Sequence, residues 1–383
     1  MAGLRMIRST KVELGLCVLS GINCYYSAWM QFQLLNFKVT RLMWRLRNKN
    51  FALIRQKFIS IVYLFCSRII PNRERRQRFL KQNAYNYLQR RAQKNPHGFN
   101  EKILYRMAFD RNPLFKILSD KIEVRKFVED RVGVNLLTPV YTICDSPDQI
   151  NWEKLPEEFV CKVSHGSGGL IGVYKDIEIN SALPLNLKAL SWQRYWVNPE
   201  RFIPSSAEAM LNKWLRSSYE WIPGCSPEWG YAGLQPRIIV EKLLMGQDSK
   251  IAIQIQLYVF DGKVGLIRSA GTNSYGKRTM NYYSKEWQRL SIQLLGGSRN
   301  ALAENFQPKP INLASMISVA EILGKGLDFV RVDLYDLGTD IRFGEMTLYP
   351  SAGEGCWMPS NFNFELGAHW KITPHFAADI LTR

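Results

Sequence analysis

The chain has 383 residues, 46% of them hydrophobic, with seven cysteines and a formal net charge of +18. This length and apolar content are sufficient for a sizeable core, which excludes a small module held together by disulfides. The cysteines are scattered and odd in number, which favours a reducing compartment. The sequence contains no GxSxG, HExxH or paired CxxC motif, so nothing in it indicates a serine hydrolase or a zinc site of these types.

The first 95 residues are predicted to form a basic, aromatic, helical extension. Residues 38–95 contain sixteen Lys and Arg but a single acid, Glu74, so almost the whole positive excess lies there. Bases interleaved with aromatic residues predict helices with basic and apolar faces, which is typical of proteins that bind an anionic membrane surface. A nucleic-acid partner would also suit the charge, but the uncharged, aromatic segment 15–37 favours the membrane, and no nucleic acid is expected.

Segment 15–37 is long enough to span a bilayer, but polar residues interrupt it, so spanning the membrane and lying on it both stay open. It lacks the long apolar region and small-residue cleavage site of a secretory signal peptide. The alternative is a solvated helical extension that packs on the rest of the protein.

The turn-forming sequence NPHGFN at 95–100 marks the predicted boundary between the extension and the body of the protein. Helices are expected to dominate residues 101–135, with Ser119 as the N-cap of a helix that runs through Asp130. A surface helix is the simplest interpretation of this segment.

Residues 159–176 predict two strands joined by a glycine-rich turn. Lys162 lies near the end of the first strand, and Gly166, Gly168 and Gly169 free the backbone of the turn. Successive amide N–H groups in such a turn, together with a lysine, suit the phosphates of a nucleotide. No GxxxxGK[ST] pattern and no helix signal are present, so a strand-turn-strand flap is expected instead of a P-loop, with an ordinary hairpin as the alternative.

Residues 182–235 are rich in tryptophan and tyrosine. Such a surface can stack on sugar rings, but core packing accounts for most tryptophans.

The apolar strand PRIIVEKLL at 236–244 ends in Glu241 and Lys242, followed by two leucines and Gly246. The edge of such a strand offers N–H and C=O groups to a purine, and its apolar neighbours can sandwich the ring. The segment is therefore a candidate adenine hinge, although the pattern by itself is weak.

Residues 329–350, FVRVDLYDLGTDIRFGEMTLYP, predict two alternating strands joined at 336–340. Arg331 and Asp333 share one face of the first strand, whereas Phe343, Glu345 and Thr347 are expected to share a face of the second. If the register places Asp333 and Glu345 opposite or diagonal, the two carboxylates lie too close to persist without a cation, and hard oxygen ligands favour Mg²⁺. A salt-bridged solvent face is the alternative.

Taken together, these segments resemble the ATP-grasp superfamily of carboxylate-amine ligases, most closely its teichuronopeptide-biosynthesis (TupA-like) branch. The matching stretches lie in order between residues 98 and 370: SDKIEVRKFV at 119–128, LPEEFVCKVSHGSGG at 155–169, PRIIVEKLL at 236–244, FVRVDLY from Phe329, and FGEMTLYPSAG from Phe343. The resemblance implies an α+β / α/β ATP-grasp fold, in which two α+β lobes grip ATP. The corresponding domains are 1–95 for the extension, 96–155 for a lead-in, 156–245 for the flap lobe and 246–383 for the lobe with the metal site.

The resemblance also implies roles for individual residues. The glycine turn, His165, Gly166, Ser167, Gly168 and Gly169, would cover the phosphates, with Lys162 as a phosphate ligand. Glu241, Lys242 and Leu244 would form the adenine hinge, and Asp248 would hold the ribose, as in the similar EKWLSGPE stretch of D-alanine:D-alanine ligases. Asp333 and Glu345 would ligate magnesium and Arg331 would stabilise the transition state. Thr347 stands where those ligases carry an asparagine, and its hydroxyl can ligate the metal or orient a metal-bound water.

The implied chemistry is activation of a carboxylate by ATP to an acyl phosphate, followed by attack of an amine to give an amide, ADP and phosphate. The cofactors would be ATP and Mg²⁺, with two ions expected, and the substrates a glycan uronic acid and an amino acid or amino sugar. This predicts a cytoplasmic enzyme, peripheral on the inner face of the membrane, in surface-polysaccharide biosynthesis. A polysaccharide or sugar kinase on the same fold and a non-catalytic nucleotide-binding membrane scaffold are the alternatives.

Overall fold

The computed structural model describes residues 70, 72–92, 94–179, 181–184, 186–187, 190–222, 225–247, 250–272, 278–295 and 308–373. The chain divides into two compact units, Met1–Arg76 and Gln77–Arg383. Most of the predicted basic extension, including segment 15–37, lies outside the described residues. Among the residues that are described, no helix is both long enough and apolar enough to cross a membrane.

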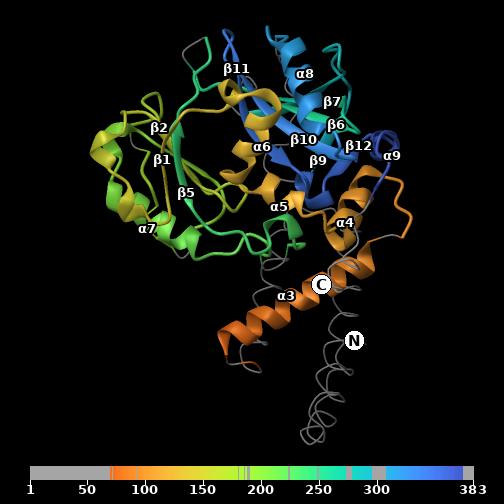
Figure 1. Ribbon diagram of the computed structural model, residues 1–383, viewed down its shortest axis with the longest axis horizontal. Helices are drawn as coiled ribbons and strands as arrows, with labels where there is room; N and C mark the ends of the chain where they lie inside the picture. Colours follow the sequence, from red (N-terminus) through yellow and green to blue (C-terminus); the bar gives the residue numbers. More distant parts are fainter. Residues whose placement is uncertain are drawn as a thin grey trace, which may run out of the picture. The chain divides into compact units, whose positions relative to one another are not determined.

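The second unit contains two large sheets with helices packed on them (Figure 1). The longer helices are α3 (Arg73–Arg91), which begins in the first unit, α4 (Phe99–Phe109), α5 (Leu114–Ser119), α6 (Glu123–Val132), α7 (Pro204–Leu215), α8 (Leu313–Gly324) and α9 (Phe362–Ala368).

The predicted helix 119–130 with Ser119 as its N-cap was wrong in its start. Ser119 ends α5, and α6 begins only at Glu123. The carboxylate of Asp120 accepts hydrogen bonds from the backbone N–H groups of Ile122 (2.8 Å) and Glu123 (3.2 Å). A carboxylate accepts two such bonds more readily than a hydroxyl does, so the helix break follows Asp120.

The first sheet has the order β1-β5-β2-β3-β4, with strands β1 (Val140–Cys144), β2 (Phe159–Val163), β3 (Leu170–Val173), β4 (Arg194–Val197) and β5 (Ile238–Lys242). Strands β2 and β3 are antiparallel and pair Lys162 with Leu170, so the predicted strand-turn-strand around the glycines is confirmed. Helix α7 covers one face through Met210, Leu211 and Trp214, all of which are buried against strand residues such as Val240. We call this sheet with α7 the flap lobe.

The second sheet has the order β11-β10-β6-β7-β8, with strands β6 (Gln254–Phe260), β7 (Lys263–Thr272), β8 (Arg278–Tyr283), β10 (Phe329–Asp336) and β11 (Ile341–Thr347). A short pair, β9 (Gln293–Leu295) with β12 (Cys356–Met358), lies beside it. Helix α8 packs on β6, β7 and β10, and Phe99 of α4 meets Phe329 edge-on with ring centroids 5.1 Å apart. We call this sheet with its helices the C-terminal lobe.

Strands β10 and β11 form the predicted hairpin, but their alternation is interrupted. Asp333 pairs with Glu345, whereas Leu334 pairs with Phe343, so Gly344 is an extra residue in β11. This β-bulge turns Phe343 onto the buried apolar face with Leu334, while Glu345 and Thr347 stay on the face of Asp333 and Arg331. The prediction that Phe343, Glu345 and Thr347 share one face was therefore wrong for Phe343, because regular alternation does not anticipate a bulge.

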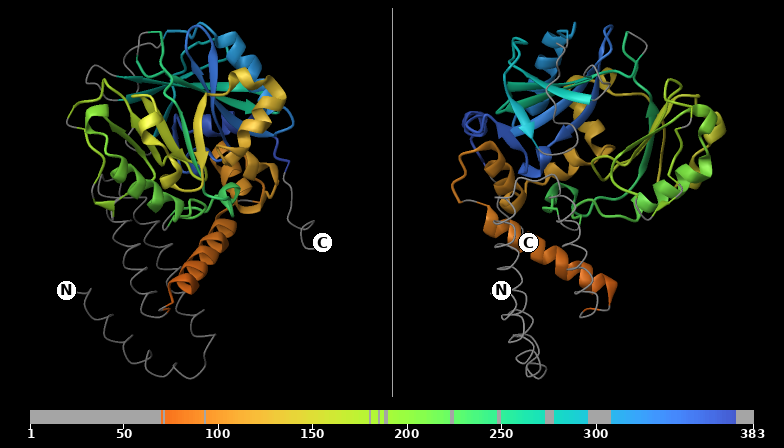
Figure 2. Two further views of the ribbon diagram at one scale, coloured as in Figure 1. Left: turned by 60° about the vertical axis from the view of Figure 1, so that its left-hand side comes forward. Right: turned by 180° about the vertical axis from the view of Figure 1, so that it is seen from behind.

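The segment between α5 and α6 touches both lobes. The backbone N–H of Lys121 donates to the carbonyl oxygen of Ser164, at the end of β2, over 3.1 Å, and α5 contacts β11. Figure 2 shows the two sheets from two further directions, as separate layers with α5 and α6 near their junction. This arrangement brings the glycine turn of the flap lobe toward the acidic face of β10 and β11.

Candidate active site

The centre of the site is a pair of carboxylates bridged by an arginine. The guanidinium of Arg331 donates to both carboxylate oxygens of Asp333, from Nε to Oδ1 over 2.6 Å and from Nη2 to Oδ2 over 2.7 Å. The same Nη2 donates to Oε1 of Glu345 over 2.8 Å, and the hydroxyl of Thr347 donates to that oxygen over 3.1 Å. Asp333 is fully buried, whereas the side chain of Glu345 is 32% exposed. The predicted meeting of Asp333 and Glu345 on one face is confirmed, in direct cross-strand register.

The two carboxylates have different electrostatic surroundings. Burial raises the pKa of Asp333 to about 6, and Glu345 adds to the effect although Arg331 opposes it. Burial also acts to raise the pKa of Glu345, but Arg331, Lys121 and Arg194 outweigh it, so this pKa lies below its ordinary value. Glu345, the more exposed carboxylate of the pair, is thus held ionised by the positive charges of Arg331, Lys121 and Arg194.

Beneath Asp333 lies a row of polar side chains from β6 and β7. The amide nitrogen of Gln256 donates to Oδ2 of Asp333 over 2.6 Å, and Nε of Arg268 donates to the amide oxygen of Gln256. These two hydrogen bonds fix the orientation of the Gln256 amide, because the arginine can only donate and must therefore meet the amide oxygen. Asp333 is thereby held from two sides.

Across from the carboxylates, Lys162 on β2 forms an ion pair with Oε2 of Glu241 on β5. Arg125 of α6 binds the other oxygen, Oε1, over 3.2 Å, and Glu241 is 94% buried. Burial alone would lower the pKa of Lys162, but Glu241, Tyr335 and Glu345 outweigh it and raise it, so this lysine carries its charge. Its electrostatic interactions with Tyr335 and Glu345 place Lys162 opposite the carboxylate pair.

The glycine turn is held by Lys121 and by Trp192. The ammonium of Lys121 donates to the carbonyl oxygen of Gly166, and burial lowers its pKa to about 8 although Glu345 acts the other way. Gly168 and Gly169 have positive φ angles of 84° and 60°, and a β-carbon on Gly168 would collide with the carbonyl oxygen of Trp192. A β-carbon on Gly166 would lie 2.6 Å from the ring of Trp192. Glycine is therefore required at these positions both for backbone conformation and for space.

His165 is buried, and its imidazole nitrogen Nε2 lies 3.0 Å from the carbonyl oxygen of Ser217. Its ring meets Trp192 edge-on, and burial lowers its pKa, so the imidazole is neutral at pH 7. The other nitrogen, Nδ1, is buried and finds no hydrogen-bond partner in the part of the chain that the structure describes. Its proposed contact with a phosphate stays a prediction.

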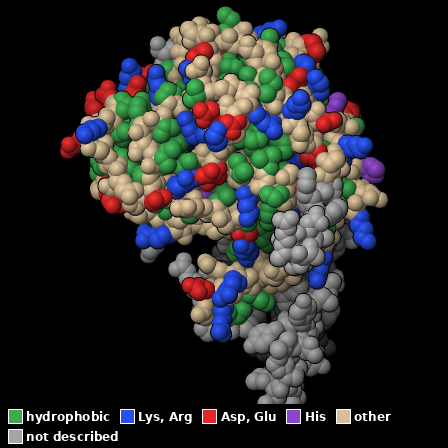
Figure 3. All heavy atoms as spheres, viewed as in Figure 1, with side chains coloured by type: hydrophobic (Ala, Val, Ile, Leu, Met, Phe, Trp, Pro, Cys, Tyr) green, Lys and Arg blue, Asp and Glu red, His purple; other side chains and the backbone are tan. Residues whose placement is uncertain are grey.

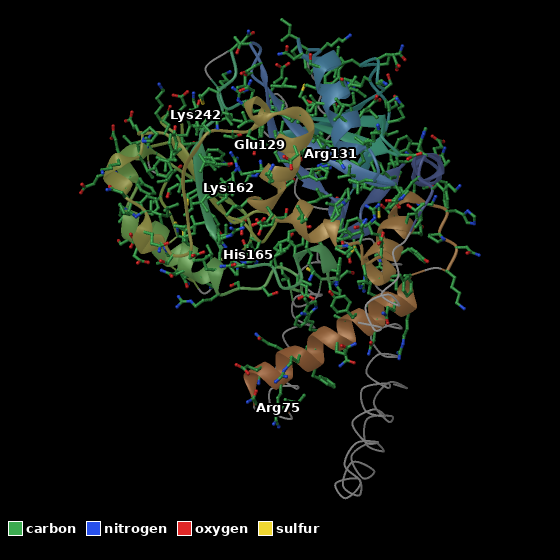
Figure 4. All side chains as sticks on the ribbon, viewed as in Figure 1. Arg75, Glu129, Arg131, Lys162, His165 and Lys242 are labelled. Carbon is green, nitrogen blue, oxygen red and sulfur yellow. The ribbon has the colours of Figure 1, made fainter. Side chains whose placement is uncertain are left out.

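The predicted hinge comprises Glu241 and Lys242, the last two residues of β5, and Leu244 just after the strand. Glu241 points toward Lys162, whereas Lys242 is exposed, and the carbonyl oxygen of Leu244 accepts from the backbone N–H of Ala252 over 2.9 Å. Figure 4 labels Lys162, His165 and Lys242, which lie on or directly after strands of the flap lobe. Asp248 lies outside the described residues, so its predicted role at the ribose stays a prediction.

Two further side chains, Arg194 and Tyr335, belong to the site but were not singled out from the sequence. Arg194 begins β4, pairs with Leu170 directly after the glycine turn, and interacts electrostatically with Glu345 and Tyr335. Tyr335 lies on β10, two residues beyond Asp333, and its hydroxyl accepts from Gln254 over 3.4 Å. Alternation along β10 could have indicated Tyr335, but nothing local in the sequence indicates Arg194, because its partners are about 140 residues away.

The oxygen donors fit Mg²⁺ bound together with a nucleotide. No group of three or more His, Cys, Asp or Glu side chains suited to a metal occurs among the described residues, so a cage made wholly of such side chains is not formed by them. Magnesium typically keeps several waters and takes one or two carboxylates together with substrate phosphates. Asp333 and Glu345, with the Thr347 hydroxyl hydrogen-bonded to Glu345, provide such a set.

Comparison with known proteins identifies a family for this chain. The family model described as TupA-like ATPgrasp matches residues 101–371. No curated protein sequence matches significantly. Among solved structures, a D-alanine–D-alanine ligase from Bacillus anthracis is 15% identical, with 61% of this chain and 57% of that chain covered and a TM-score of 0.30. The ATP-grasp ligase PsnB with its minimal precursor is 11% identical (62% and 53% covered, TM-score 0.31), and the D-cycloserine synthetase DcsG is 14% identical (67% and 71% covered, TM-score 0.32).

The chain thus spans little more than half the length of the ligase and of PsnB. The family model, in contrast, covers most of the chain, including both lobes and every described residue of the predicted site. The protein belongs to the TupA-like ATP-grasp family.

Proposed function

We propose that the protein is an ATP- and Mg²⁺-dependent carboxylate-amine ligase that forms an amide through an acyl phosphate. The observation that carries the proposal is the cross-strand pair of Asp333 and Glu345, bridged by Arg331 and facing Lys121 and Lys162 of the flap side. An array of oxygen donors ringed by cations is suited to bind and stabilise a phosphoryl group in transfer.

Each residue has a distinct task in this proposal. Asp333, Glu345 and Thr347 would hold the magnesium, which supplies charge neutralisation at the phosphates when bound. Lys162 and the glycine turn would bind the phosphates, and Arg331 would stabilise negative charge on the transferring group. Glu241 keeps Lys162 charged and oriented. No side chain becomes covalently modified.

The substrates follow from the family name and not from a residue of the site. We propose a uronic acid of a surface glycan as the carboxylate and an amino acid or amino sugar as the amine, in assembly of a cell-surface polysaccharide. The experiment is ADP release by the full-length protein with Mg²⁺ and ATP, across a panel of uronic acids, amino acids and amino sugars, with product masses. Condensation with loss of water supports the ligase, whereas gain of one phosphate assigns the kinase and no ADP release with any pair supports the scaffold.

Peripheral binding to the cytoplasmic face of the membrane is part of the same proposal, since it would place the enzyme beside a lipid-linked glycan. Its support is the cluster of bases between residues 38 and 95. The full-length protein is expected to co-sediment with vesicles containing phosphatidylglycerol, and not with phosphatidylcholine alone. Equal binding to both vesicles, or to neither, contradicts this placement.

A further inference from the structure

Glu228 is a carboxylate without a partner beside the site. It precedes the turn Trp229–Tyr231, and its backbone N–H donates to the carbonyl oxygen of Glu220 over 2.8 Å. Its side chain is only partly exposed and, within the described residues, makes no hydrogen bond or ion pair. The neighbouring acids differ, since Glu220 binds Lys81 and Tyr85, and Glu354 binds Arg91 and Ser226.

Two tyrosines lie close to Glu228 along the backbone, because Glu228 hydrogen-bonds through its main chain to Glu220, the neighbour of Tyr219, and to Tyr231. The rings of Tyr219 and Tyr231 have centroids 4.7 Å apart, and Trp192 meets Tyr219 at 5.1 Å. Burial and then Glu228 raise the pKa of both tyrosine hydroxyls, so these hydroxyls are neutral and lie near the Glu228 carboxylate. Burial and Glu228 also raise the pKa of Tyr349, although Arg106 opposes them. The Tyr349 hydroxyl accepts a hydrogen bond from the Gly230 N–H over 3.2 Å.

The same tyrosines connect Glu228 to the reaction centre. Both Tyr219 and Tyr231 interact electrostatically with Glu345 as well as with Glu228, so their hydroxyls lie within range of both carboxylates. Tyr219 also hydrogen-bonds the side chain of Ser167 in the glycine turn. The two tyrosine hydroxyls therefore link Glu228 to Glu345, one of the proposed metal ligands.

The charge balance at Glu228 is unfavourable as it stands. Burial, with a further contribution from Glu354, raises its pKa to about 8, and no cation offsets either effect. The ionised form of Glu228 is therefore disfavoured until a cation lies beside it, and an ammonium ligand, which aromatic faces also attract, would stabilise that form. Glu228 is partly exposed, and Figure 3 shows acidic and basic side chains close together in the middle of the face that it draws.

We propose that Glu228 and the ring faces of Tyr219 and Tyr231 bind the protonated amine of the second substrate. The inference rests on the proposed ligase function and makes it more specific: the acceptor enters as a primary ammonium compound. The kinase alternative requires a hydroxyl acceptor, which is uncharged and therefore cannot neutralise the negative charge of Glu228.

The test is a binding measurement that does not need turnover. Ethanolamine, D-glucosamine and L-alaninamide are titrated calorimetrically into the full-length protein at pH 7 with Mg²⁺ and ADP, each beside its neutral N-acetyl derivative. At least one amine is expected to bind tenfold or more tightly than its N-acetyl form. Glu228→Gln should reduce the ratio of the two affinities at least tenfold. Glu157→Gln, the same change at an exposed residue, should leave this ratio unchanged.

Tyr231 offers a second variant that does not depend on the carboxylate. Tyr231→Phe keeps the ring face and should retain the preference, whereas Tyr231→Leu should weaken it several-fold. Absence of ammonium preference in the wild type for all three amines, or its survival in Glu228→Gln, overturns the proposal. A separate titration of ADP with Mg²⁺ into the same variants, and the release of ADP with product, report on the ligase function, so the two failures are distinguishable.

Discussion

At the scale of single residues, the site is governed by how Arg331 offsets two negative charges. Asp333 and Glu345 lie directly opposite on adjacent strands, where like charges are destabilising. One guanidinium donates to both, and its buried position makes these bonds stronger than they would be in water. Each carboxylate has further lone pairs, so a metal ion can share the pair with Arg331.

Asp333→Asn should abolish most activity while leaving the fold intact. The substitution keeps the size of the side chain but removes the charge that the metal and Arg331 require. ADP release is expected to fall by about 100-fold or more, which is typical when one preorganised electrostatic contact is lost. Steady-state kinetics and a circular dichroism melt are the measurements.

Asp340→Asn is the matched control, because this aspartate lies in the turn of the same hairpin and forms only a surface ion pair with Arg342, at 2.7 Å. It should change ADP release less than twofold. Full activity of Asp333→Asn would contradict the proposal that Asp333 binds the magnesium ion.

Glu228 should make the protein less stable as the pH rises. Its pKa in the folded state, about 8, lies above the ordinary value of 4.5, so between these values the folded state holds a proton that the unfolded state has lost. The contribution of Glu228 to stability is complete below pH 4.5 and is lost as the pH rises toward 8. The charged and titratable groups that act on or respond to Glu228 are Glu354, Tyr219, Tyr231 and Tyr349.

Urea unfolding at pH 5 and pH 8 of the wild type and of Glu228→Gln measures this effect. A single group changes stability by at most about 1.4 kcal/mol per pH unit, and partial solvent screening reduces the total to about 2 kcal/mol. The glutamine variant should gain stability relative to the wild type at pH 8 but not at pH 5. Parallel pH dependences of the two proteins would contradict the raised pKa.

At the scale of elements, the strands were the most predictable part of the molecule. Alternation of apolar and polar residues placed β10 and β11, because a period of two is a strong signal, and the glycine-rich turn between two apolar runs placed β2 and β3. Two local features were not predictable. The bulge at Gly344 needs knowledge of the partner strand, and the break between α5 and α6 depends on Asp120 accepting bonds from N–H groups that a continuous helix would use internally.

Gly168→Ala should impair nucleotide binding more than stability. Gly168 has φ of 84°, and its added β-carbon would meet the Trp192 carbonyl oxygen, so the turn must move. The KM for ATP is expected to rise at least about tenfold, since displaced N–H groups no longer converge on the phosphates.

The comparison that isolates this steric effect is Gly233→Ala. Gly233 also has a positive φ, 69°, but nothing lies within 4 Å of its added β-carbon. Both variants should lose about 1 kcal/mol of stability from backbone strain, and only Gly168→Ala should change the KM for ATP. An equal KM in the two variants would exclude a role of the glycine turn at the phosphates.

At the scale of the whole molecule, the site is assembled from segments far apart in the chain. Lys121 reaches Gly166, and Arg194 on the flap lobe acts on Glu345 on the C-terminal lobe. The sequence indicated Lys162, Asp333 and Glu345 through their local patterns, and the order of motifs supplied the family. It could not indicate which loops meet, so Arg194 and Glu228 emerged only from the three-dimensional structure.

Because the proposed phosphate contacts lie in the flap lobe and the proposed metal ligands in the C-terminal lobe, a nucleotide with its metal should stabilise the unit as a whole. At a ligand concentration of 100 times Kd, binding adds about 2.7 kcal/mol, which corresponds to a rise in Tm of about 4 °C or more. Thermal denaturation with ADP and Mg²⁺ should show this rise. EDTA and, separately, Lys162→Met should each remove most of it, and an equal rise in the presence of EDTA would argue against joint binding.

The most direct test of the ligase proposal is to trap the acyl phosphate. The full-length protein is incubated with ATP, Mg²⁺ and a uronic acid panel in the presence of hydroxylamine, which attacks acyl phosphates to give hydroxamates. A carboxylate-amine ligase is expected to form a hydroxamate in equal amount with ADP for at least one acid, and Asp333→Asn is expected to form none. Release of ADP with a phosphorylated sugar and no hydroxamate would contradict the ligase assignment.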